Sequence, residues 1–93
     1  MLTKDADLAG ARFVNTNLAD AHFRDVKLSG AQFLDVSLTA ARFEDVAFTG
    51  AVISNANCTD VSISNACYDG MTIDGVLVTE LLRIYRAHEA SAG

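Results

Sequence analysis

The sequence predicts an all-β protein, a four-sided parallel β-helix of about four coils that is closed at its C-terminal end by a capping α-helix. Apolar residues recur every five positions along most of the chain, and a weaker period of twenty lies on top of the first. After Val78 the five-residue period stops and a helical pattern begins. We therefore divide the chain into a repeat domain, residues 1–78, and a capping helix with a frayed tail, residues 79–93.

The five-residue period sets the predicted fold. Two positions before each apolar centre stands a small or β-branched residue, such as Ala11 or Val36. Two positions after it stands a turn former, such as Asn15 or Asp25, with Ala40 the one exception up to Gly75. Turn formers of this kind tolerate a positive φ or bond their own backbone. A helix would spread a period of five around its surface, and a strand alternates with period two. A chain that turns a corner every five residues instead keeps the same two positions inside.

The apolar centres are the predicted structural core, and they include all five phenylalanines of the chain. They are Leu8, Phe13, Leu18, Phe23, Leu28, Phe33, Leu38, Phe43, Phe48, Ile53, Cys58, Ile63, Tyr68 and Ile73, followed by Val78.

The period of twenty is an independent test of the square coil, because four corners at five-residue spacing close one turn. Glycine recurs at this spacing, and each glycine precedes a residue at an inward position. The positions are Gly10, Gly30, Gly50 and Gly70. Each set of residues spaced by twenty predicts one column of stacked side chains.

The repeat units resemble those of the pentapeptide-repeat family, whose pattern is Ala, Asp or Asn, Leu and two variable residues. Ala6-Asp7-Leu8-Ala9-Gly10 matches this pattern fully, and Thr16-Asn17-Leu18 and Ala56-Asn57-Cys58 match it in part. The resemblance covers roughly residues 4–78. It implies a right-handed quadrilateral β-helix, and it implies little about function, because the family is defined by its scaffold.

The two ends of the predicted solenoid differ. At the C-terminal end Thr79 can cap a helix with apolar residues at Leu81, Leu82 and Tyr85, which we expect to cover the last coil, with a role in dimer formation as the alternative. The N-terminal end has no such cover, and an open apolar ring with unpaired strand edges is rarely left bare. We expect a homodimer that forms through this ring, with the helix as the competing site. The candidate interface residues are Leu8, Phe13, Leu18 and Phe23 in the ring and Ile84 on the helix.

No pattern of catalytic or ligand-binding residues stands out. His22 and His88 are the only histidines, and neither is paired in the repeat register. Cys58 falls at an inward position and Cys67 at an outward one, which disfavours a disulfide. We expect no catalytic residue, no cofactor site and no metal site, and therefore no enzyme.

Composition narrows the choice of partner. The net charge of −5 leaves no basic surplus to neutralise phosphates, so we expect no direct binding to nucleic acid. The apolar runs are much shorter than the ~20 residues of a membrane-spanning helix, and the N-terminus lacks the order of a signal peptide. We expect a bacterial, cytoplasmic protein that does not bind membranes.

Two hypotheses for function remain. The first is a non-catalytic scaffold that presents β-helix faces to a protein partner or to a second copy. The second follows from the resemblance, since some pentapeptide-repeat proteins imitate duplex DNA and bind type II topoisomerases such as gyrase. Asp5, Asp25 and Asp45 would then imitate phosphates on one corner. Basic and histidine side chains interrupt this acidic surface, at Arg12, His22, Arg24, Lys27 and Arg42.

Overall fold

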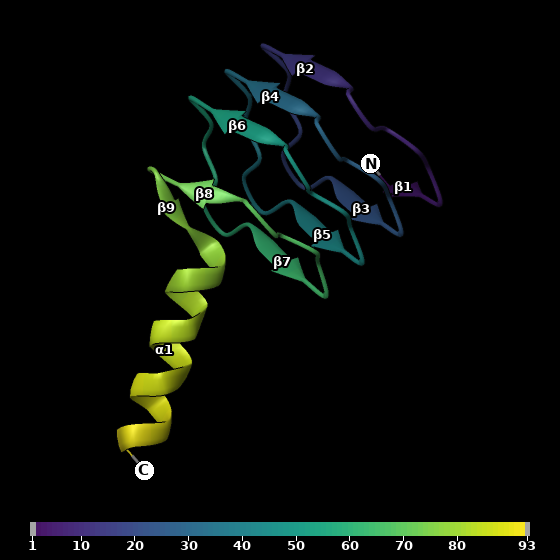
Figure 1. Ribbon diagram of the computed structural model, residues 1–93. Coiled ribbons are helices and arrows are strands. Elements are labelled where there is room, and N and C mark those ends of the chain that lie inside the picture. The colour runs from purple at the N-terminus through teal and green to yellow at the C-terminus, as the bar shows by residue number, and fades with distance from the viewer. Residues whose placement is uncertain (1, 93) are drawn as a thin grey trace.

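The computed structural model describes residues 2–92 and the side chains of residues 2–89, so Met1 and Gly93, the outer ends of the two predicted segments, lie outside the described residues. Short strands follow one another along the chain and a helix ends it (Figure 1). The elements are β1 (Leu2–Lys4), β2 (Arg12–Val14), β3 (His22–Arg24), β4 (Gln32–Leu34), β5 (Arg42–Glu44), β6 (Val52–Ser54), β7 (Ser62–Ser64), β8 (Thr72–Ile73), β9 (Val76–Leu77) and α1 (Val78–Ala92).

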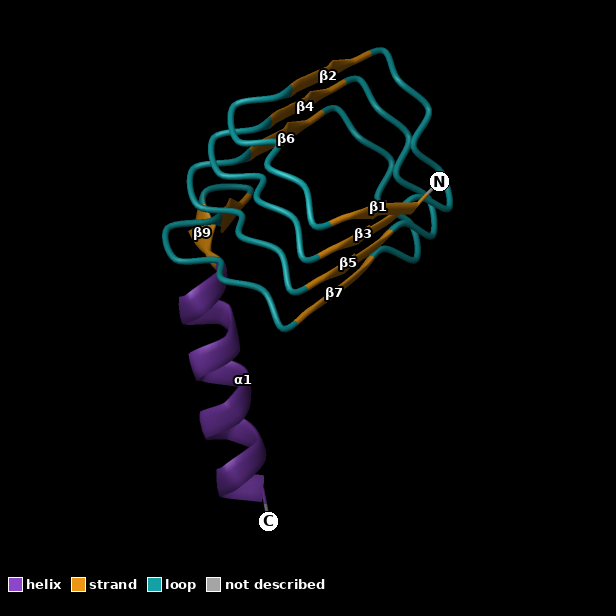
Figure 2. Cartoon of the chain, turned by 90° about the vertical axis from the view of Figure 1, so that its right-hand side faces the viewer, coloured by secondary structure: helices purple, strands orange, loops and turns teal. Residues whose placement is uncertain are grey.

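The strands form the sides of a four-sided coil (Figure 2). One side is the parallel sheet β1-β3-β5-β7 and another is the parallel sheet β2-β4-β6. Isolated parallel bridges hold the two sides between them, for example Lys27 to Ala47 and Ser37 to Asn57. Partners in every one of these parallel pairs are twenty residues apart, as Phe13 and Phe33 are. The predicted fold class is confirmed, with about three turns in place of the expected four.

The corners are made by residues in the left-handed region of backbone conformation. Gly10 has a φ of 74°, Asp25 of 54° and Asn55 of 54°, and the other predicted turn formers from Asp5 to Gly75 also have positive φ. At every second corner the turn closes with a backbone hydrogen bond, as where the Ala11 N–H donates to the Leu8 carbonyl at 3.0 Å. A left-handed residue every five positions therefore bends the chain into a square instead of a straight strand.

The core lies inside the middle of the stack. The inward residues from Leu18 to Phe48 are buried, and they form one cluster with the small residues that precede them, such as Ala31 and Ala41. The phenylalanine rings stack between successive coils, with centroids 4.8 Å apart for Phe13 and Phe33 and 4.9 Å apart for Phe23 and Phe43. These distances match the spacing between strands, so the backbone ladder itself sets the ring stacking.

The solenoid ends earlier than the predicted residue 78. The last bridge between coils joins Ala47 to Cys67. Asp74 and Gly75 then form the two-residue loop of an antiparallel hairpin, in which Ile73 pairs with Val76. Both loop residues have positive φ, 49° and 83°, as a two-residue hairpin of the type favoured by Asp-Gly requires. The hairpin turns the chain back where a further coil would have continued.

The C-terminal helix is present, but it does not cover the last coil. In Figures 1 and 2 α1 leaves the side of the solenoid and points away from it. The expectation of a cap is therefore corrected: β9 directs the helix outwards because α1 begins at the residue after β9 ends. The helix also runs to Ala92, so the segment expected to fray from Ala87 onwards is helical. Its residues are mainly alanine and other residues compatible with a helix.

We expect the two neighbours on β4 to differ sharply in their effect on stability. Phe33 is fully buried between Phe13 and Phe43, whereas Gln32 is exposed. Phe33→Ala should lower the free energy of unfolding by ~3–5 kcal/mol, because it removes a core ring and leaves a cavity. Gln32→Ala should change it by no more than about 0.5 kcal/mol. Chemical denaturation followed by circular dichroism measures both, and equal effects would contradict the register.

Ala40 offers a stabilising substitution. It has a φ of 61° at a corner that Asp20 and Asp60 occupy in the neighbouring coils, and a Cβ is strained in that conformation. Ala40→Gly should therefore raise the free energy of unfolding by about 0.5–1 kcal/mol, after the greater entropy of the unfolded glycine chain is subtracted. The reverse change is the control. Gly30→Ala should cost about 1 kcal/mol through conformation alone, since the new Cβ would come only within 4.0 Å of the Gly10 nitrogen. A lower melting temperature for Ala40→Gly would refute this account.

Candidate interaction surfaces

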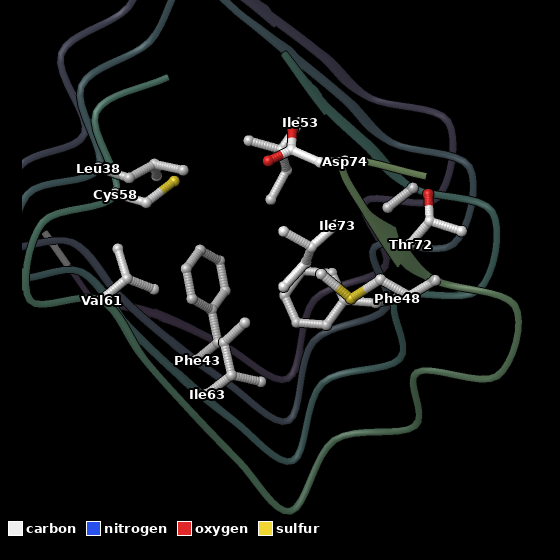
Figure 3. A pocket seen from close by; sticks show the side chains of 12 residues that line it. Leu38, Phe43, Phe48, Ile53, Cys58, Val61, Ile63, Thr72, Ile73 and Asp74 are labelled. Atoms are coloured by element: carbon white, nitrogen blue, oxygen red, sulfur yellow. The ribbon is translucent and has the colours of Figure 1, made fainter. Parts of the chain in front are cut away.

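The C-terminal end of the solenoid is an open apolar cavity, which we call the open end. It has a volume of about 370 Å³, and its lining includes Phe43, Ile53, Cys58, Ile63 and Ile73. Figure 3 shows these side chains around a common space, which Asp74 also lines. They occupy inward positions of the repeat, but in the described part of the chain no coil lies beyond Ile63 and Ile73. Ile63 is 40% exposed and Ile73 54% exposed as a result.

A second hollow lies between the open end and the start of the helix. It has a volume of about 490 Å³ and is lined by Ile63, Tyr68, Met71 and Ile73 from the last coil and hairpin, together with Val78, Leu82 and Arg86 from α1. The first half of the helix, from Val78 to Arg86, thus faces the last coil across this hollow. Val78 and Leu82 are half-buried there, whereas Leu81, Ile84 and Tyr85 are exposed.

The helix exposes an apolar stripe of its own. Leu81, Ile84 and Tyr85 are spaced as neighbours on one helix face, and all three are exposed. Beside them Arg83 Nε donates to Glu80 Oε2 at 3.1 Å. This hydrogen bond holds the pKa of the Glu80 carboxyl below its usual value and raises the pKa of the Arg83 guanidinium. The ion pair is fully exposed, so it serves the helix surface and not a buried site.

Large exposed apolar side chains gather at this end of the molecule. Of the ten found among the residues whose side chains are described, seven lie between residues 63 and 85. They are Ile63, Ile73, Val76, Leu77, Leu81, Ile84 and Tyr85. Concentrations of this kind are common where proteins bind partners.

The N-terminal end is better covered than the sequence suggested. Leu8 and Phe13 are half-buried, but Leu18 and Phe23 are part of the buried core. The reason is that β1 adds a further strand on one side, where Thr3 pairs with Phe23. Of the five candidate interface residues, Phe23 and Leu18 thus offer almost no surface, Leu8 and Phe13 offer some, and Ile84, at the opposite end, is 54% exposed.

The outward positions carry charges that interact locally. Asp5, Asp25 and Asp45 occupy one corner in successive coils, all exposed and all with positive φ, so backbone conformation explains each of them. Arg24 Nε lies 3.9 Å from Asp25 Oδ2. On the neighbouring side Glu44 Oε1 lies 3.2 Å from His22 Nε2 and 3.2 Å from Arg42.

The chemistry-bearing residues are dispersed. Among the described residues, no three or more His, Cys, Asp or Glu side chains gather as metal ligands would. Cys58 and Cys67 are both free and exposed, and Cys67 Sγ lies 3.9 Å from Asp69 Oδ2. No helix in the described part of the chain has the length and apolar character needed to cross a membrane.

Sequence reasoning missed the hairpin that shapes this end. Gly75 fits the five-residue register as one more corner, and Ile73 and Val78 fit it as two more inward residues. The signal that could have identified the hairpin is the pair Asp74-Gly75 between Ile73 and Val76, because two adjacent residues with positive φ make a hairpin turn.

The accessibility of Cys58 tests whether the end is open. Cys58 is inward in register but exposed, so in dilute native protein it should react with a thiol reagent at a rate comparable with that of outward Cys67. Cys67→Ser and Cys58→Ser variants isolate the two rates, which absorbance of the released thiolate measures. A Cys58 that reacts only after unfolding would show that the helix or another segment covers it.

Comparisons with known proteins agree with this geometry. The model of pentapeptide repeats matches the chain in eight copies, over residues 4–45 and 31–67. Among solved structures, the 1.7 Å crystal structure of a pentapeptide repeat protein from the Arabidopsis thaliana thylakoid lumen is similar, with 32% sequence identity and a TM-score of 0.51. The match covers 70% of this chain and 49% of that one, so this chain spans about half the length of that protein. No curated protein matches the chain. The repeat register, the four-sided coil and the family match together place this chain in the pentapeptide-repeat family.

Proposed function

We propose that the protein is a non-catalytic scaffold for protein–protein interaction, and that its docking surface is the open end together with the exposed stripe of α1. The observation that supports this proposal most directly is the exposure of Ile63 and Ile73, which occupy core positions of the repeat and yet face solvent. A pentapeptide-repeat solenoid is a rigid support, and a rigid support loses little entropy when a partner binds.

The energetics favour a bound partner. Burying a full isoleucine side chain contributes ~1.5–3 kcal/mol, so covering a half-exposed one contributes about half of that. Seven large apolar side chains are exposed between residues 63 and 85, and together they could supply several kcal/mol against the entropy of association. The four sides of the solenoid offer less apolar surface to a partner, because their outward positions are mostly polar or small.

Imitation of DNA is the alternative function, and it has weaker support. The acidic corner holds only Asp5, Asp25 and Asp45, and Arg24 lies beside one of them. Duplex DNA carries one phosphate charge per ~1.7 Å of its axis, a much denser array than one carboxylate per coil at ~4.8 Å.

The docking surface can be tested with a pair of matched variants. The wild-type protein is immobilised, and the proteins that it retains, including further copies of the chain itself, are quantified. The same measurement is made with the immobilised Ile63→Glu/Ile73→Glu variant, and the two amounts are compared. The control is Val14→Glu/Val52→Glu, which changes two residues of similar exposure on the outward side formed by β2 and β6.

We expect the open-end variant to lose at least tenfold of the specific binding and the control variant to retain it, since a buried unpaired charge at an interface costs more than ~1.4 kcal/mol. Circular dichroism checks that both variants fold. Equal retention by the open-end variant and the wild type would contradict the proposed surface.

A further inference from the structure

We propose that the partner at the open end contributes an extended segment, which pairs with β6 as one more parallel strand while one of its apolar side chains enters the cavity. This inference rests on the proposed docking surface and names the kind of partner that the surface receives. It starts from two features that meet at one place, an unpaired strand edge and an apolar cavity.

The unpaired edge belongs to β6, the last strand of the sheet β2-β4-β6 (Figure 1). Where β6 joins β4, the Val52 N–H donates to the Ala31 carbonyl at 2.8 Å. A strand beyond β6 would donate in the same way to the Ala51 carbonyl. In the chain itself Thr72 stands at that spacing, but it pairs with Leu77 of the hairpin and not with β6. The edge of β6 is therefore a template for a strand from another molecule.

The backbone groups of this edge determine what can pair with it. Alternate residues of a parallel strand bond to neighbours on opposite sides, and Val52 and Ser54 bond to β4. The N–H and carbonyl of Ile53 therefore face away from β4, together with the Ala51 carbonyl and the Asn55 N–H. In a helix the corresponding groups bond within the helix. An extended segment supplies donors and acceptors in the matching order.

The cavity of the open end adjoins the same edge. Its lining includes Ile53 of β6 on one side and Thr72 and Ile73 of β8 on the other, so the cavity lies between these two strands. Ile53 continues the column of Phe13 and Phe33, and the next residue of this column would point into the cavity. Pockets of about 370 Å³ hold whole small molecules, so this one accommodates a large apolar side chain.

The edge of β7 has different surroundings. Ile63 and Asn65 line the hollow that Val78 and Leu82 of α1 also line, so a strand added to β7 would meet the helix of its own chain. Beside β6 the lining comes from the coils and the hairpin, without a residue of α1. The edge of β6 is therefore the better acceptor for an added strand.

A whole coil of a second copy fits this end less well than an extended segment does. Such a coil would have to stack on all four sides, and the hairpin and the start of α1 lie over part of the end. An extended segment needs the edge of β6 and the cavity beside it.

The charge of this end favours a basic segment over an acidic one. Residues 51–77, which include the last coil and the hairpin, contain Asp60, Asp69 and Asp74 and no basic residue. Asp74 also lines the cavity. A segment with a basic residue next to its apolar residue meets opposite charge here, whereas an acidic segment meets like charge. The partner is thus a protein with an extended segment of basic and apolar residues.

A peptide that copies strand β2 is a suitable probe, because β2 belongs to the same sheet and has an arginine next to a phenylalanine. The peptide comprises residues 10–16, Gly10-Ala11-Arg12-Phe13-Val14-Asn15-Thr16. We expect the fluorescently labelled peptide to bind the 93-residue chain with a Kd between about 10 μM and 1 mM, measured by anisotropy. No saturable binding up to ~1 mM would overturn the inference.

Methylation of single peptide nitrogens separates strand pairing from apolar contact. In the register of the coils, the Arg12 N–H of the bound peptide donates to the Ala51 carbonyl, and the Phe13 N–H points away from β6. Methylation of the Arg12 nitrogen should weaken binding about tenfold, because the Ala51 carbonyl loses its donor. Methylation of the Phe13 nitrogen is the matched control and should leave the Kd within about twofold. Equal losses for the two peptides would overturn the strand pairing.

The side chains of the peptide are tested in the same assay. Phe13→Ser in the peptide should abolish saturable binding, because no apolar side chain then fills the cavity. Arg12→Glu in the peptide should weaken binding several-fold, since its carboxylate meets the acids of this end. Full binding of the serine peptide would show that the cavity is not used, and tighter binding of the glutamate peptide would contradict the basic segment.

Cys58 provides a readout in the protein itself. Cys58 lines the cavity, whereas Cys67 does not. In a Cys67→Ser variant, the peptide should slow the reaction of Cys58 with a thiol reagent in proportion to the bound fraction. In a Cys58→Ser variant, Cys67 should react at an unchanged rate. Slowing of both cysteines, or of neither, would mean that the peptide binds elsewhere.

Failure of this inference and failure of the proposed function give different results. If the open end still retains partner proteins and Ile63→Glu/Ile73→Glu abolishes this binding, but no peptide binds, the docking surface stands and the added strand is wrong. If the wild type forms growing assemblies in sedimentation and loses peptide binding as its concentration rises, the occupant is a second copy and the inferred partner is wrong.

Discussion

The whole structure depends on one constraint of the backbone, a residue in the left-handed conformation at every fifth position. Each such residue bends the chain at a corner, and four corners return it to a point one strand spacing further along. Because one turn of the coil takes twenty residues, Phe33 pairs with Phe13 in the next coil. Residues twenty apart pair in the same way all around the coil. Side-chain columns, ring stacks and the two parallel sheets all follow from this spacing.

Stacking also explains why the surfaces of interest lie at the ends. Each coil buries its inward residues only against the coils before and after it. In a stack of about three turns the middle coil has two neighbours, and the first and last have one each. Burial therefore falls from complete at Phe33 to partial at Ile53 and to substantial exposure at Ile73, which all belong to one column of the predicted register. A solenoid with few coils therefore buries few of its inward residues and leaves a large share of them exposed at its ends.

The sequence alone was sufficient for the periodic part of the fold and insufficient for its termination. The register from Leu8 to Phe48 could be read directly, because corner residues and inward residues repeat with little variation. Asp74 and Gly75 also fall within that pattern, since a turn former at 75 suits both a further corner and a hairpin loop. The adjacent pair Asp74-Gly75, in which both residues have positive φ, is what distinguishes the two.

The same limit applies to the helix and the candidate surface. Leu81, Leu82 and Tyr85 show that α1 has apolar positions, but amphipathicity does not say what an apolar face packs against. The direction of the helix is set by its junction with β9, and no composition pattern encodes that direction. For the same reason Cys58 and Ile63 could be assigned to inward positions, while their exposure depended on the absence of a coil beyond them.

The Asp74-Gly75 hairpin also limits how copies of this chain can assemble. A solenoid with two bare, matching ends is a template for head-to-tail growth, in which the first coil of one copy continues the last coil of the next and a fibre results. Here β8 and β9 pair antiparallel with each other and not with β6, so the chain itself does not extend the sheet β2-β4-β6. The hairpin thus makes the last coil unlike the first, so the two ends of this solenoid are not matching templates.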